Sequence, residues 1–152
     1  HSFFTFEITA DQGAWYELKR HRMLTLTTQS FTPHLGFTLP RVIEQAGFRD
    51  EYVSLMQKCS QLYTKLEKVQ SGVGSYLLPN AFKRRFLVSS NLRSLIHLIN
   101  LRSAANAHYS VRRIALRMAE LVQTVIPNFA PYLFNPSNED WSMIEKRFFT
   151  EA

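Results

Sequence analysis

One segment that is apolar around most of its circumference constrains the fold more than any other. Residues 91–102 carry six large apolar side chains at helical spacing: Leu92, Leu95, Ile96, Leu98, Ile99 and Leu101. A helix with so little polar surface is stable only where neighbouring elements or another subunit cover it. We therefore predict a buried helix here, and we expect an oligomer to cover part of it.

Five other segments show helical spacing of apolar residues. The expected helices are a short one capped by Asp11 that contains Trp15 and Leu18, a second short one over residues 40–46 that stops at Gly47, a long one capped by Asp50 that ends at Gly72, one capped by Asn106 that stops at Pro127, and a last one over about residues 137–149.

Two segments alternate between apolar and other residues, which is typical of half-buried strands. In the first, Phe4, Phe6 and Ile8 alternate with threonine and glutamate, and the second covers residues 82–89. The threonine-rich segment 23–40 is expected to be a loop or an irregular strand. Together these patterns predict an α+β fold in which a small antiparallel sheet packs with several helices.

The chain has 152 residues, a formal net charge of +6 and a single cysteine, Cys59. This length suits one domain, so we expect residues 1–152 to form a single domain of a longer parent chain. One cysteine excludes an intramolecular disulfide framework and a zinc site built from several thiolates. Cys59 lies on the apolar stripe of the long helix, which predicts a buried structural thiol. The positive charge fits either an anionic partner or a solvated surface.

No stretch approaches 18 consecutive apolar residues, and the first residues lack the pattern of a signal peptide. We therefore expect a cytoplasmic protein without a membrane partner. The five histidines do not have the spacing of zinc proteases, and no metal site is predicted.

The sequence Arg20-His21-Arg22 is followed, after seven residues, by Ser30. Basic side chains alone suit the negative end of a helix dipole, but this does not account for the spacing to the serine. The whole motif resembles the signature of the flavin-dependent thymidylate synthases. A second block resembles the same family: Leu78-Pro79, residues 91–95, residues 100–102 and Ala107-His108. The resemblance covers approximately residues 3–127, although residues 31–73 match poorly and the family's first segment is missing.

The resemblance implies the reductive methylation of dUMP to dTMP. In this family methylenetetrahydrofolate supplies the carbon, reduced FAD supplies the hydride and NADPH regenerates the flavin. No enzyme cysteine attacks the uracil. Members are homotetramers whose sites form between subunits, so the resemblance implies a homo-oligomer or a second domain of the same family as partner.

The resemblance also assigns roles to individual residues. Cofactor contacts fall on Arg20, His21, Arg22, Asn91, Arg93 and His97. Substrate contacts fall on Arg20, Ser30 and Arg102, and Arg102 is the catalytic residue that binds and polarises the uracil. Asn91 and Arg102 differ by about 20° in helical angle, which predicts that they share a face nearly opposite that of Arg93 and His97.

Several nucleotide-binding positions of the family differ in this chain. Thr27-Thr28 replaces an Asn-Glu pair, Thr32-Pro33 replaces Arg-Tyr, Glu17 replaces a glutamine and Ser75 replaces a phosphate-binding arginine. A nucleotide phosphate would lose charge-assisted partners through these changes. Lys83, Arg84 and Arg85 are candidate replacements.

Three functions remain open on the sequence. The first is an active flavin-dependent thymidylate synthase domain. The second is a degenerate copy that keeps the fold, with or without FAD, and serves as a structural or assembly partner of a complete copy. The third is a basic nucleic-acid-binding module that uses Arg112, Arg113 and Arg117, although no known nucleic-acid-reading motif is present.

Overall fold

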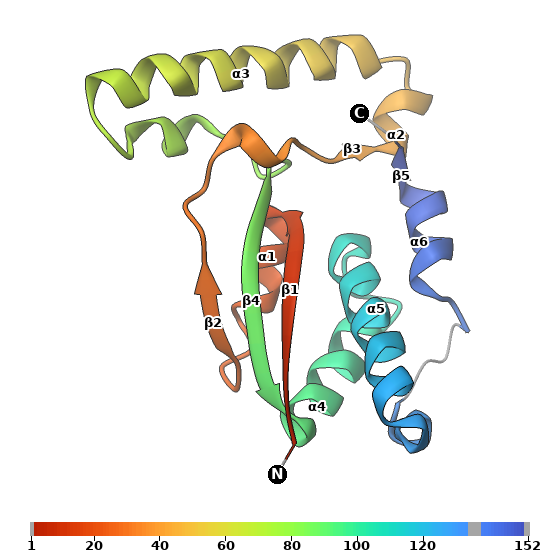
Figure 1. Ribbon diagram of the computed structural model, residues 1–152. Helices are drawn as coiled ribbons and strands as arrows, with labels where there is room; N and C mark the ends of the chain where they lie inside the picture. The colour runs from red at the N-terminus through yellow and green to blue at the C-terminus, as the bar shows by residue number, and fades with distance from the viewer. Residues whose placement is uncertain (1, 134–137, 151–152) are drawn as a thin grey trace.

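A computed structural model describes residues 2–133 and 138–150. Its elements are, in chain order, β1 (Phe3–Asp11), α1 (Gln12–Leu18), β2 (Thr25–Thr28), the 3-10 helix η1 (Pro33–Leu35), β3 (Leu39–Pro40), α2 (Arg41–Gln45), α3 (Arg49–Val69), η2 (Val73–Leu77), β4 (Lys83–Asn91), α4 (Leu92–Ser103), α5 (Tyr109–Val125), η3 (Pro127–Tyr132), α6 (Trp141–Phe148) and β5 (Phe149–Thr150) (Figure 1).

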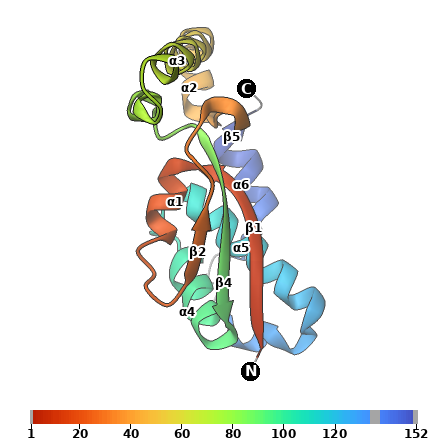
Figure 2. The same ribbon diagram turned by 60° about the vertical axis from the view of Figure 1, so that its left-hand side comes forward.

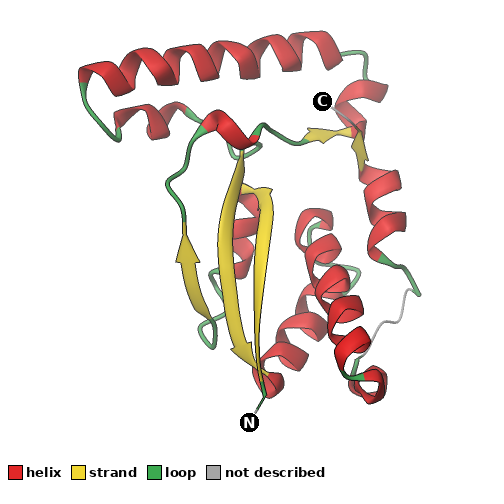
Figure 3. Ribbon diagram, viewed as in Figure 1, coloured by secondary structure: helices red, strands yellow, loops and turns green. Residues whose placement is uncertain are grey.

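The main sheet has three antiparallel strands in the order β1-β4-β2. β4 is the central strand, because Val88 pairs with Phe6 of β1 on one side and with Leu26 of β2 on the other. The helices α1, α4 and α5 lie on one face of this sheet, and α3 crosses above its end (Figure 2). A second pair, β3 with β5, joins residues 39–40 to the C-terminal part of the chain. The predicted α+β class with a small antiparallel sheet is confirmed (Figure 3).

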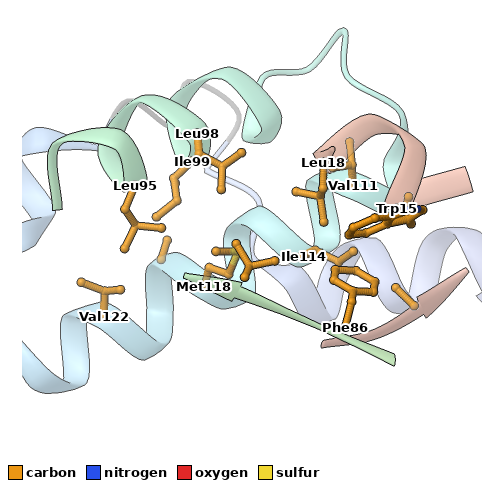
Figure 4. Packing of buried hydrophobic residues seen from close by; sticks show 14 of the residues in the cluster. Trp15, Leu18, Phe86, Leu95, Leu98, Ile99, Val111, Ile114, Met118 and Val122 are labelled. Atoms are coloured by element: carbon orange, nitrogen blue, oxygen red, sulfur yellow. The ribbon is translucent and has the colours of Figure 1, made fainter. Parts of the chain in front are cut away.

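The core lies between the sheet and these three helices (Figure 4). Phe86 and Val88 of β4 are fully buried and meet Trp15 and Leu18 of α1 in one cluster with apolar residues of α4 and α5. Phe86 packs against Trp15 at 4.9 Å between ring centroids. The predicted helix over residues 91–102 is present as α4, with Leu95, Leu98 and Ile99 buried within the chain. Its coverage in an oligomer stays a prediction.

Two of the three predicted helix caps are wrong. Asp11 caps α1 as expected, since its Oδ1 accepts a hydrogen bond from the Ala14 amide at 2.8 Å. The helix α3, however, begins one residue before Asp50, which therefore sits in its first turn. Asn106 does not cap α5, because a turn that joins the Ala107 amide to the Ala104 carbonyl delays the helix. His108 is the cap of α5 instead.

Other boundaries shift in ways that local spacing could not reveal. The segment 23–40 supplies a regular four-residue strand, β2, because β4 offers it a free edge for hydrogen bonding. The helix α6 starts at Trp141 after its cap Asp140, and residue 137 of the prediction lies outside the described residues. Cys59 is buried on α3 beside Met56 and Phe82, in agreement with a structural thiol.

The alternation of β4 generates a stability prediction. Phe86 is buried and Leu87, its neighbour, is 38% exposed on the open face of the sheet. We expect Phe86→Ala to lower the free energy of unfolding by about 3–5 kcal/mol, because a large cavity remains beside Trp15. Leu87→Ala is the matched control and should cost less than about 1.5 kcal/mol. Urea denaturation followed by circular dichroism measures both, and equal losses would contradict the described register.

Candidate functional site

The arginine-histidine-arginine stretch forms the turn that follows α1. This turn begins where the His21 amide donates to the Leu18 carbonyl at 3.0 Å. Because Leu18 is fully buried, the turn is anchored in the core and directs His21 inward, where only 7% of the residue is exposed. Arg20 and Arg22 lie on the surface on either side of it. The motif therefore presents one buried imidazole between two exposed guanidinium groups.

His21 packs against α4, a helix that comes more than 70 residues later in the chain. The ring of His97 lies 5.3 Å from the ring of His21, measured between centroids, at an interplanar angle of 39°. His97 itself is exposed, so one edge of the pair faces solvent. Two residues that the motif and the second block contributed separately are thus neighbours in the structure.

The protonation of His21 follows from its surroundings. Burial lowers the pKa of His21 below its ordinary value of 6.5, and the positive charges of His97 and Arg102 lower it further. A hydrogen bond to the Ser94 backbone opposes this shift, which is the direction expected when the ring donates to a carbonyl. The Nε2 atom is buried without a hydrogen-bond partner. Neutral His21 with its proton on Nδ1 therefore offers Nε2 as an acceptor.

Arg102 reaches the same region from the last turn of α4. Its Nη1 atom lies 2.9 Å from Oε2 of Glu17, and Nη1 of Arg20 lies 3.1 Å from Oε1 of the same carboxylate. The side chain of Arg102 is only 16% exposed. Its Nε atom is buried and has no hydrogen-bond partner. Arg102 thus keeps an unused donor although Glu17 occupies one end of its guanidinium group.

The prediction that Asn91 shares a face of α4 with Arg102 is wrong, because Asn91 lies outside the helix as its cap. Asn91 and Arg93 line one cavity of about 720 Å³ at the start of α4, whereas Arg102 and His97 both act on His21. Asn91 departs from the helical angle because it is the cap, with extended backbone angles, and its Oδ1 accepts from the Ser94 amide at 2.9 Å. The guanidinium group of Arg102 does not follow the helical angle of its Cα atom either, because the long side chain turns toward Glu17 of α1.

Ser30 lies beyond the end of β2 and is exposed. The described contacts do not join it to His21 or Arg102. The neighbouring Arg84 is committed to the fold, because its Nε and Nη2 atoms donate to the Gln29 carbonyl at 3.1 and 3.0 Å. Its guanidinium group also lies over the rings of Trp15 and Phe31. This arrangement argues against Arg84 as a replacement phosphate ligand.

Sequence reasoning did not identify Glu17 as the partner of Arg102. Its place three residues before the motif marked a departure from the family, and its spacing to Arg20 allowed an ion pair on α1. The contact with Arg102 depends on the tertiary arrangement that brings α1 near the last turn of α4, for which local sequence carries no signal. Among residues 2–133 and 138–150, no cluster of three or more histidine, cysteine, aspartate or glutamate residues could hold a metal ion. No helix in this part of the chain is long and apolar enough to cross a membrane.

Comparison with known sequences relates this site to a family. A family model described as thymidylate synthase complementing protein matches residues 1–128. A UPF0159 protein of Chlamydia muridarum is 35% identical over 130 residues, which are 86% of this chain and 25% of that protein. The corresponding protein of Thermoplasma acidophilum is 30% identical over 129 residues, 84% of this chain and 26% of that protein.

This chain covers a larger share of a relative whose name states an activity. The flavin-dependent thymidylate synthase of Geobacter sulfurreducens is 33% identical over 139 residues, which cover 84% of this chain and 59% of that protein. This chain thus spans about a quarter of the two UPF0159 relatives and a little over half of the Geobacter protein.

The surroundings of His21 generate a pH prediction. Well above pH 6.5 the imidazole is neutral in both folded and unfolded chains, and as the pH falls through 6.5 the unfolded chain takes up the proton more readily. Stability should therefore decrease as the pH falls below 6.5, until the lower pKa of folded His21 is reached. Thermal unfolding from pH 7.5 to 5 measures this loss, and the loss should be smaller in His21→Gln.

The same prediction has an atomic readout. His97→Asn should raise the pKa of His21, measured by NMR titration of the ring protons, because it removes a charge that lowers it. His34→Asn is the matched control, since His34 is an exposed histidine on η1. A pKa of His21 at or above 6.5 in the unaltered protein would contradict the described environment.

Proposed function

Because the chain belongs to the thymidylate synthase complementing protein family, we propose that it is a flavin-binding domain of a flavin-dependent thymidylate synthase. The activity of the whole protein would be the reductive methylation of dUMP to dTMP with methylenetetrahydrofolate and NADPH. Two unpartnered buried atoms support the proposal that this site binds a ligand. His21 Nε2 and Arg102 Nε are buried polar atoms without hydrogen-bond partners, one an acceptor and one a donor. Such atoms cost free energy unless a ligand satisfies them.

The chemistry of these residues fits FAD. A flavin ring carries a ring N–H, which matches the acceptor Nε2 of neutral His21, whereas the donor Nε of Arg102 matches a carbonyl of the uracil. Its pyrophosphate is anionic and suits exposed guanidinium groups, of which this surface offers Arg20, Arg22 and Arg93. Asn91 lies beside Arg93 in the cavity at the start of α4. We therefore propose that Arg20, His21, Arg22, Asn91, Arg93 and His97 hold the cofactor.

Bound flavin would supply hydride transfer, which no amino-acid side chain provides. The protein residues would orient and polarise the reactants. Arg102, with a side chain that is 16% exposed, would donate to a uracil carbonyl from a largely water-free position, where such a hydrogen bond is stronger than in water. Arg20 and Ser30 would contact the nucleotide.

The contact of Glu17 with Arg102 favours a second candidate function, a non-catalytic copy. The carboxylate bridges Arg102 and Arg20 and so partly neutralises the two cations proposed to receive the nucleotide. Ser75, which stands where the family has a phosphate-binding arginine, uses its hydroxyl to hold the Gly72 carbonyl. A chain of this kind would retain the flavin surface and serve as a structural or assembly partner of a complete copy.

The domain organisation belongs to the same proposal. We propose that residues 1–152 form one domain of a longer protein, which acts as a homo-oligomer or beside a second domain of the same family. The relatives support this in one respect, since each extends well beyond the segment that it shares with this chain.

Flavin retention tests the cofactor site. After FAD is added and the excess is removed, the protein should keep near-stoichiometric flavin, measured by visible absorbance. His97→Asn and Arg93→Met should each weaken FAD binding about tenfold, through a lost hydrogen bond or a lost charge. The matched controls are His34→Asn and Arg147→Met, exposed positions outside this surface. Equal weakening of FAD binding in the controls and the site variants would contradict the proposed cofactor site.

Glu17→Gln distinguishes the two candidate functions. In the FAD-loaded protein, this variant should tighten dUMP binding about tenfold, because Arg102 and Arg20 lose their internal counter-ion. Glu7→Gln, a change to a glutamate that is 3.6 Å from Arg85 on the sheet, is the control. Formation of dTMP by the unaltered chain would exclude the non-catalytic copy. An unchanged dUMP affinity in Glu17→Gln would show that the Glu17 contact is purely structural.

A further inference from the structure

A cleft on another part of the molecule gathers basic side chains from distant segments. It has a volume of about 1,020 Å³ and lies under α3, between β3, the start of β4 and the end of α6. Figure 1 shows these elements around one region above α5. Five cationic residues line it: Arg41, Arg49, Lys83, Arg113 and Lys146. They come from four helices and one strand, so the fold and not one basic segment brings them together.

The charges of the cleft are only partly compensated. Arg113 pairs with Glu145 at 2.5 Å, and Arg49 pairs with Glu44 at 2.6 Å. The hydrogen bond from Arg49 is the main cause that holds the pKa of Glu44 below its ordinary value, so this carboxylate is ionised. Lys83 and Lys146 form no ion pair within the described residues. Positive charge is therefore left over in the lining of one cavity.

Two buried donors in the cleft also lack partners. Thr38 is 9% exposed, and its Oγ1 atom makes no hydrogen bond. Arg41 donates from Nη2 to the Phe149 carbonyl at 2.8 Å, whereas its buried Nε has no partner. Buried donors without acceptors are uncommon and call for a ligand that supplies acceptor oxygens. A phosphate group supplies several such oxygens together with negative charge.

We propose that this cleft binds a small organic phosphate of nucleotide size. Lys83, Lys146 and Arg41 bind the phosphate, and the Thr38 hydroxyl donates to one of its oxygens. The apolar residues Phe37 and Val53 line the same cleft and contact the organic part. The volume lies at the upper end of the range for small-molecule sites.

The alternative occupant, a nucleic acid, agrees less well with the structure. The arginines of α5 that could follow a phosphate backbone are each engaged within the chain. Arg112 pairs with Glu139, Arg113 with Glu145 and Arg117 with Glu120. The uncompensated charge lies inside a concave site instead of along an extended surface, which favours a compact ligand.

The proposal does not depend on the flavin site. None of the residues proposed to hold FAD or dUMP lines this cleft. Lys83 was a candidate replacement ligand for the nucleotide phosphate on the sequence alone, and the structure places it in the cleft instead. Substitutions at His97 or Arg102 should therefore leave phosphate binding in the cleft unchanged, and substitutions in the cleft should leave flavin retention unchanged. Failure of one proposal can thus be recognised while the other stands.

Calorimetric titration of the whole chain with inorganic phosphate, pyrophosphate and ATP tests the proposal. Affinity should rise from phosphate to ATP. The double variant Lys83→Met/Lys146→Met should weaken ATP binding at least about tenfold, which is about 1.4 kcal/mol. Lys58→Met/Lys65→Met is the matched control. Both lysines are exposed on α3 outside the cleft, and this double substitution removes the same amount of charge. This control should stay within about twofold of the unaltered protein.

A second variant separates binding from folding. Thr38→Val keeps the shape of the side chain and removes only the hydroxyl, so it should weaken ATP binding several-fold while circular dichroism and the melting temperature stay close to those of the unaltered protein. Equal weakening in the lysine control, no saturation by about 10 mM ATP, or tighter binding of random single-stranded DNA than of ATP would each overturn the proposal.

Discussion

The packing of the turn after α1 against α4 places the buried imidazole on which the proposed flavin site depends. Leu18 is fully buried, and its carbonyl fixes the amide of His21, so burial of the leucine carries the imidazole into the interior. An imidazole placed there loses water and must find other partners. The structure supplies the Ser94 backbone for one nitrogen and leaves the other unpaired. A site that is incomplete in this way is suited to a ligand with a hydrogen-bond donor.

Glu17 sets the electrostatic balance of the same site. A guanidinium group that is mostly buried needs a counter-ion, and Glu17 provides one at 2.9 Å. An anionic nucleotide would have to compete with this carboxylate, which is tethered and needs no association entropy. A glutamine would satisfy hydrogen bonds without this competition. One residue type therefore separates a site that accepts a nucleotide readily from one that holds its own counter-ion.

Basic side chains gather at two separate places in the structure. One surrounds His21 and Arg102, and the other lies in the cleft lined by Lys83 and Lys146. The net charge of +6 did not distinguish a partner from a solvated surface. The positions of the charges are more informative, because several arginines are neutralised within the chain, whereas Lys83 and Lys146 line one cavity. Net charge is informative here only after the internal ion pairs are known.

Much of the fold follows from the sequence, and the site follows only in part. The alternation at Phe4, the cap at Asp11 and the apolar girth of α4 are local signals, and each agrees with the structure. The cap expected at Asp50 was wrong because α3 begins one residue earlier, and the cap expected at Asn106 was wrong because a turn between Ala104 and Ala107 delays α5. The contact of Glu17 with Arg102 joins residues 85 positions apart, and it depends on tertiary packing that spacing along one helix does not encode.

The central claim is that His21 Nε2 accepts a hydrogen bond from a bound flavin, and the ¹⁵N resonances of the His21 ring test it most directly. In the free protein at neutral pH, Nδ1 should show a protonated and Nε2 an unprotonated signal. Addition of FAD should shift the Nε2 resonance markedly while Nδ1 stays nearly unchanged. Bound FAD with no change at Nε2, or no FAD binding, would contradict the account.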